Sequence, residues 1–195
     1  MNGSGFDDVL ERRGTDSLKW DGMEGRFGPV PAGALPMWVA DMDFLSPPEV
    51  IEAIRKRADH GVFGYVQASQ ETFRTVSEWL LQVHDWATAP SWIVPCTGVM
   101  PAIGAAIRAF SGPGDGVVIQ PPVYPPFFRI VKDNDRVVVE NPLINEDRYY
   151  RMDMDGLRRT LEDPANRILL LCSPHNPVGR VWRKEELDQV GRLCL

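Results

Sequence analysis

The sequence has few of the features that mark secreted, metal-binding or membrane proteins. Its three cysteines, Cys96, Cys172 and Cys194, are far apart and form no C-x-x-C pair, which argues against a disulfide framework and a zinc ribbon. No apolar run approaches the roughly 18 residues that a membrane helix needs. The first residues also lack the apolar core of a secretory signal. We therefore expect a cytoplasmic protein with no membrane partner.

Positive charge and several catalytic signatures are also scarce. The chain has 21 Lys and Arg against 27 Asp and Glu, a formal net charge of −6, and this balance argues against nucleic acid as a partner. The sequence contains no P-loop, no G-x-G-x-x-G after an apolar strand, no G-x-S-x-G and no H-E-x-x-H. These absences weaken nucleotide-binding, hydrolase and metalloenzyme interpretations, and no metal site is predicted.

Hydrophobic patterning indicates a globular α/β protein. The 195 residues are 44% hydrophobic and 25% charged, which is ordinary for a folded domain. Residues 1–36 are weakly periodic and are expected to be an irregular arm. Short apolar runs predict strands at 92–94, 117–119, 137–139 and 168–172. Helical spacing predicts helices between the cap Ser46 and the stop Gly61, after Ser69, and at 101–110, 127–132, 155–161 and 184–195.

Such alternation of short apolar strands with helices predicts a doubly wound, mainly parallel sheet with helices on both faces. The sequence stops inside the last helical pattern, at residues 184–195, without a stop signal. A sheet with so few strands would keep an open edge. We therefore expect that the chain is truncated and is the first part of a longer protein.

Three segments stand where an open parallel sheet binds its ligands, beyond the carboxyl ends of strands. Residues 96–101 lead into a helix, whose first N–H groups suit an anion. Residues 120–127 hold Tyr124 among four prolines, and such a ring can stack on a planar heterocycle. Residues 173–179 fix the amide of Asn176 between prolines. Each segment taken alone is better explained as an ordinary turn, and His175 as a bystander.

Taken together, the segments resemble the class I/II aminotransferases, which are fold-type I enzymes that use pyridoxal 5′-phosphate (PLP). The closer resemblance is to the carbon–sulfur lyase branch, the cystathionine β-lyases of the MalY/PatB type. The motifs, in the family's order, are LPMWVADMDF at 35–44, FGY at 63–65, TGVMPA at 97–102, PPVYPPF at 121–127 and SPHNPVGRVW at 173–182. The resemblance implies that residues 61–195 are the first part of the PLP-binding large domain and that residues 1–60 are an arm and small-domain segment.

The resemblance also implies roles for cofactor-binding residues. The amides of Val99 and Met100, beside Gly98, would hold the cofactor phosphate at the helix N-terminus. Tyr124 would stack on the pyridine ring, and Asn176 would donate a hydrogen bond to its O3′ oxygen.

Further roles concern the substrate and a second subunit. Tyr65 would reach the phosphate of the neighbouring subunit, which implies a homodimer. The backbone near Ala40 would border the carboxylate of an amino-acid substrate, with Trp38 and Asp41 shaping that pocket.

The implied reaction is β-elimination from cystathionine or a cysteine S-conjugate, which gives a thiol, pyruvate and ammonia. The lysine that binds PLP in the family would lie beyond residue 195, so we assign no catalytic residue in this chain and expect the chain itself to be inactive. The alternatives are an aminotransferase with the same cofactor site and a non-catalytic regulatory or interaction protein. A hydrolase using Ser173 and His175 is a more distant alternative.

Overall fold

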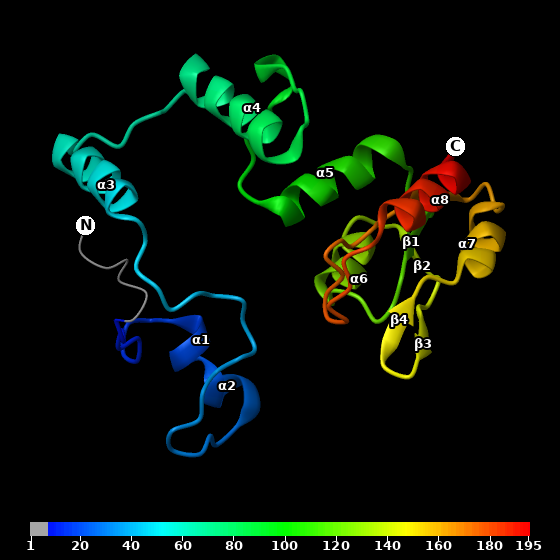
Figure 1. Ribbon diagram of the computed structural model, residues 1–195, viewed down its shortest axis with the longest axis horizontal. Coiled ribbons are helices and arrows are strands. Elements are labelled where there is room, and N and C mark those ends of the chain that lie inside the picture. Colours follow the sequence, from blue (N-terminus) through cyan, green and yellow to red (C-terminus); the bar gives the residue numbers. More distant parts are fainter. Residues whose placement is uncertain (1–7) are drawn as a thin grey trace. The chain divides into compact units, whose positions relative to one another are not determined.

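A computed structural model describes residues 8–195 (Figure 1), and the chain divides into two compact units between Ala68 and Ser69. In the described residues the first unit contains the helices α1 (Leu18–Asp21), α2 (Met23–Phe27) and α3 (Pro48–His60). The second unit contains the helices α4 (Gln70–His84), α5 (Val99–Phe110), α6 (Pro126–Lys132), α7 (Met154–Leu161) and α8 (Lys184–Cys194), with the 3₁₀ helix η1 (Pro90–Trp92). Its strands are β1 (Gly116–Ile119), β2 (Val137–Glu140), β3 (Ile144–Glu146), β4 (Tyr149–Arg151) and β5 (Asn166–Leu169).

Local signals fix the ends of two predicted helices. The helix expected after Ser69 is confirmed as α4, and the Ser69 side chain caps it by accepting a hydrogen bond from the N–H of Thr72. Gly61 ends α3 in the left-handed conformation, with φ of 72°. The prediction that Ser46 caps α3 is wrong: Pro47 stands at the cap position, and the helix begins on Pro48, whose fixed φ suits a first turn.

The sheet of the second unit has the order β2–β1–β5, and both pairings are parallel. This confirms the predicted strands at 117–119, 137–139 and 168–172, although β5 begins earlier and ends at Leu169. The predicted strand at 92–94 is wrong, because η1 takes up Trp92 and the following residues are irregular. Pro90 and Pro95 flank this segment, and prolines cannot donate to a strand ladder.

A β-hairpin, which the hydrophobic pattern does not predict, joins β3 to β4. Its turn residues Asp147 and Arg148 have φ of 49° and 68°, the two positive values of a tight hairpin turn. The turn lacks the glycine that usually marks this geometry, so its sequence gives little warning.

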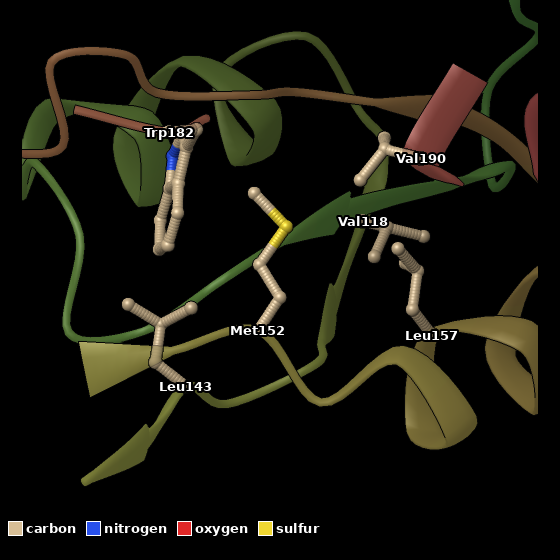
Figure 2. Packing of buried hydrophobic residues seen from close by; sticks show 6 residues of the cluster. All are labelled: Val118, Leu143, Met152, Leu157, Trp182 and Val190. Carbon is tan, nitrogen blue, oxygen red and sulfur yellow. The ribbon is translucent and has the colours of Figure 1, made fainter. Parts of the chain in front are cut away.

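Alternate residues of the central strand β1 point to opposite faces of the sheet. Val118 packs on one face with buried residues from the hairpin region, α7, the segment before α8, and α8 itself: Leu143, Met152, Leu157, Trp182 and Val190. Figure 2 shows these six side chains turned toward one another. Val117 packs on the other face with Ile107 of α5 and Val131 of α6. Each fully buried valine contributes about 1.5–3 kcal/mol, and the predicted cover of helices on both faces is confirmed.

Candidate functional site

Three predicted segments converge at one edge of the sheet. Since β1 and β5 are parallel neighbours, the loops that follow them leave from the same edge. Ile119 at the end of β1 packs with Val123 and Phe127 in a buried cluster, and Met100 of α5 and Cys172 after β5 pack against the same cluster. One hydrophobic cluster therefore joins the segments around Gly98, Tyr124 and Asn176.

The first turn of α5 offers backbone donors to an anion. Gly98 stands at the cap position with φ of 157° and ψ of 171°, a backbone conformation that residues with a side chain rarely adopt. The first hydrogen bond of the helix runs from the N–H of Ala102 to the carbonyl of Gly98 over 3.3 Å, so the amides of Val99 and Met100 precede it. No side chain in residues 8–195 caps this helix. The helix dipole adds a favourable field for negative charge at this end.

Tyr124 presents a ring on a rigid base. Its side chain meets Phe127 edge to face, with ring centroids 5.8 Å apart and an interplanar angle of 86°. Its carbonyl accepts a hydrogen bond from the N–H of Phe127 at 2.9 Å, and Pro126 begins α6 immediately after the loop. Tyr124 as a whole is 38% exposed, so the residue is not fully covered by the protein.

Asn176 lies at the tip of a closed turn that follows β5. The N–H of His175 donates to the carbonyl of Arg180 at 2.7 Å, and the N–H of Gly179 donates to the carbonyl of His175 at 2.8 Å. Gly179 supplies the positive φ, 73°, that the turn requires. Asn176 is exposed, so its amide is presented to solvent by a backbone held on both sides.

His175 joins the second and third segments. Its side chain is 1% exposed, and its Nε2 lies 3.0 Å from the carbonyl oxygen of Pro122. A carbonyl can only accept, so Nε2 carries the proton and donates it. Burial lowers the pKa of His175, and hydrogen bonds to backbone carbonyls oppose that shift. A buried neutral histidine with this bond is not an exposed general base, so the geometry does not support a hydrolase using Ser173.

Trp182 and Arg180 support the base of the Asn176 turn. The Trp182 ring lies edge to face against His175, with centroids 5.3 Å apart, and its Nε1 donates to the carbonyl of Cys172 at 2.8 Å. The Arg180 guanidinium donates to Glu186 at 2.6 Å and lies 4.4 Å from the ring centroid of Tyr149 and 4.7 Å from that of Trp182. The Arg180 guanidinium is therefore engaged by partners from the second unit: Glu186, Tyr149 and Trp182.

Gln120 anchors the Tyr124 loop at the end of β1. Its side chain is 1% exposed and its Nε2 donates to Oδ1 of Asn141 at 3.1 Å. The backbone N–H of Asn141 donates to the carbonyl of Ile119 at 2.9 Å, and its Nδ2 donates to the carbonyl of Asp153 at 3.2 Å. The loop therefore starts from a buried polar network.

Four other predicted residues, Trp38, Ala40, Asp41 and Tyr65, lie in the first unit. Tyr65 is fully exposed there. The Trp38 ring lies edge to face against Phe27 at 5.3 Å, and its Nε1 donates to the carbonyl of Lys19 at 3.1 Å. Asp41 pairs with Arg12 at 2.9 Å, and the exposed Ala40 lies between Trp38 and Asp41 in the chain.

An ion cluster that sequence reasoning missed holds this segment. Lys19, which is 8% exposed, donates from Nζ to the Asp43 carboxylate at 2.6 Å and to the carbonyl of Asp41 at 2.7 Å. Arg12 donates to both aspartates. Hydrogen bonds from Lys19 first, and from Trp20 and Arg12, hold the pKa of Asp43 well below its usual range. Carboxylates within an apolar run were the signal, because such groups need cationic partners.

Two structural findings concern other kinds of site. In residues 8–195, no group of three or more His, Cys, Asp or Glu side chains is placed to hold a metal ion. Among the same residues, no helix is both long and apolar enough to cross a membrane.

Comparisons with known proteins agree with the predicted family. Residues 35–195 match the family described as "Aminotransferase class I and II". The chain is 46% identical over 190 residues to cystathionine beta-lyase PatB of Bacillus subtilis, an alignment that covers 97% of this chain and 49% of PatB.

Solved structures agree as well. The structure superposes on PLP-containing cystalysin from Treponema denticola with a TM-score of 0.88 at 42% identity, covering 95% of this chain and 47% of that one. For the PLP-bound C-S lyase from Staphylococcus hominis the TM-score is 0.87 at 30% identity, covering 98% and 48%.

The chain spans about half the length of the curated relatives it matches. The predicted resemblance and fold class are confirmed by the match over most of the chain and by the superpositions. On its sequence motifs, its sheet topology and these comparisons, the chain belongs to the class I and II aminotransferase family.

Proposed function

We propose that the protein is a PLP-dependent carbon–sulfur β-lyase that releases a thiol, pyruvate and ammonia from cystathionine or a cysteine S-conjugate. Its β-lyase relatives and their PLP-bound structures support this activity. In this proposal residues 61–195 are part of the PLP-binding domain and residues 1–60 are an arm and small-domain segment.

The residues at the edge of the sheet fit PLP, which carries a phosphate, an aromatic ring and a phenolic oxygen. The amides of Val99 and Met100 suit the phosphate, and the open conformation of Gly98 leaves the helix end uncovered on that side. Tyr124 would stack on the pyridine ring, and Asn176 would donate to its O3′ oxygen. When bound, PLP takes up the electron pair released at the substrate's α-carbon; the chain's part is to hold that ring in place.

The convergence of three segments on one hydrophobic cluster is the observation that carries this proposal. The helix end, the ring and the amide are each ordinary features, and their meeting at the carboxyl ends of parallel strands is what a planar phosphorylated cofactor needs.

The residues that the proposal assigns to substrate binding lie in the first unit. The backbone near Ala40 would border the substrate carboxylate, with Trp38 and Asp41 shaping the pocket. Tyr65 is fully exposed in its own unit, as a residue that reaches across a homodimer would be. We also propose that the protein acts in the cytoplasm.

The test uses the protein as its source makes it, with its intact mass measured first. We expect bound PLP and pyruvate release from L-cystathionine without any keto acid. Asn176→Ala should weaken PLP binding, whereas Lys132→Gln, at the end of α6, should not. A protein that binds no PLP would contradict the proposal.

Amino transfer is the second candidate, because the matched family is described by that activity. The same cofactor contacts would serve both reactions. Product formation that depends on a keto-acid acceptor would favour the aminotransferase, and pyruvate release without an acceptor would favour the lyase.

A further inference from the structure

The turn that carries Asn176 and the loop that carries Tyr124 are connected by a single buried side chain. His175 is 1% exposed, whereas its neighbours Pro174 and Asn176 are exposed. Its Nε2 donates to the carbonyl of Pro122, two residues before Tyr124. The backbone of His175 closes its own turn through Arg180 and Gly179. One residue thus fixes the turn internally and ties it to the neighbouring loop.

The residues around the His175 ring hold it in one orientation and one tautomer, so that its hydrogen bond to Pro122 is maintained. Trp182, which is 4% exposed, packs edge to face on the ring and closes the base of the turn through the carbonyl of Cys172. The donated proton must be on Nε2, since Pro122 offers only an acceptor. A buried neutral ring with a fixed tautomer keeps the distance between the Asn176 turn and the Tyr124 loop constant. An exposed and mobile side chain would not do so.

We propose that His175 is a positioning residue that holds Asn176 and Tyr124 in a fixed relation, so that the amide meets the edge of the cofactor ring while the tyrosine covers its face. This inference rests on the proposed function. His175 itself would touch no cofactor; it acts through Asn176, which adjoins it in the chain, by tying the turn of Asn176 to the loop that carries Tyr124.

The experiment measures the dissociation constant of PLP in the full-length protein for a set of variants. His175→Phe keeps a ring of similar size against Trp182 but removes the donor, and His175→Gln keeps an N–H that can reach Pro122. We expect His175→Phe to weaken PLP binding about tenfold and His175→Gln to restore it to within about threefold of the unaltered protein.

A double-mutant cycle with Asn176→Ala separates positioning from general support. If His175 acts through Asn176, His175→Phe should cost less than about threefold in a protein that already carries Asn176→Ala. An equal loss in both backgrounds would overturn the proposal, as would normal PLP binding by His175→Phe. A protein that binds no PLP before any substitution would instead overturn the proposed function.

Circular dichroism of the cofactor-free proteins checks that each variant folds. If His175→Phe does not fold, the same cycle compares His175→Gln with His175→Asn, whose shorter amide does not reach Pro122. Weaker PLP binding by His175→Asn that disappears in the Asn176→Ala background would support the proposal. Equal binding by the Gln and Asn variants would overturn it.

Discussion

The Nε2 of His175 and the carbonyl oxygen of Pro122 lie 3.0 Å apart, although 53 residues separate them in the chain. The two loops follow adjacent parallel strands, β1 and β5, so the sheet already places them close together and the hydrogen bond joins them. The edge of the sheet brings the loops near each other, and this hydrogen bond sets their relation. Changes at this edge should therefore affect ligand binding more than changes of similar size elsewhere.

Gly98→Ala should weaken both folding and PLP binding. A Cβ at Gly98 would meet only Pro101, at 3.8 Å, so the cost comes from the backbone conformation and not from crowding. Such strain costs about 1–3 kcal/mol. If the backbone relaxes to relieve it, the N–H groups of Val99 and Met100 change direction and no longer point at the phosphate. Thermal melting and PLP titration check the effect. Gly191→Ala is the matched control, since its Cβ meets nothing within 4 Å in helix α8, where alanine is favoured.

Neutral His175 should make folding stability depend on pH. Burial lowers its folded-state pKa below the ordinary value of 6.5, so the unfolded chain binds the proton first as the pH falls. The contribution is fully present above pH 6.5 and is lost as the pH falls toward the folded-state pKa.

Urea unfolding of the protein and of His175→Gln between pH 8 and pH 5, about the range over which an unperturbed histidine changes charge, measures this contribution. The stability difference between the two proteins should shrink at the acid end. His60→Gln, at an exposed histidine, serves as control. A difference that stays constant over the whole range would show that His175 is not held neutral.

Asp43→Asn should loosen the segment around Ala40. The substitution removes the charge that accepts from Lys19 and Arg12, and it leaves the buried Lys19 ammonium with a weaker partner. Hydrogen exchange followed by mass spectrometry should show faster exchange over residues 37–44. Added salt should have a similar but smaller effect, because these pairs are partly exposed. Asp59→Asn, at an exposed aspartate of α3, should leave that segment unchanged.

The parallel sheet could be predicted from sequence because its strands are short apolar runs flanked by polar or turn residues. Val117 and Val118 face opposite sides of one buried strand, and this pattern needs no knowledge of partners. The apolar run at 92–94 had the same composition, but a strand also needs a neighbour, and Pro90 and Pro95 make pairing costly. Hydrophobic periodicity indicates whether a segment prefers to form a strand. It does not show whether another strand is available to pair with that segment.

The candidate site divides along similar lines. The helix end at Gly98 and the turn at Asn176 could be predicted from local backbone chemistry and from the order of the motifs. The role of His175 could not, because it depends on a carbonyl 53 residues away. The cluster of Lys19 and Asp43 likewise pairs residues 24 positions apart, and only the fold shows which cation meets which carboxylate.

The lysines of this chain should not bind PLP covalently at one specific position. All four, Lys19, Lys56, Lys132 and Lys184, lie in the described residues. Lys19 is paired with Asp43 in the first unit, and Lys184 is paired with Asp188 at 2.7 Å at the start of α8. Lys56 and Lys132 are exposed on α3 and α6. A covalent site needs an amine that lies close to the cofactor and is free to attack it, and Lys19 and Lys184 are engaged in ion pairs instead.

Borohydride reduction of the 195-residue chain with PLP, followed by peptide mapping, tests this expectation. We expect weak labelling spread over the exposed lysines, and least labelling at Lys19. Lys132→Gln and Lys184→Gln should each remove only their own share. Stoichiometric labelling of a single lysine would mean that this chain itself supplies the amine, and the assignment of no catalytic residue to it would then be wrong.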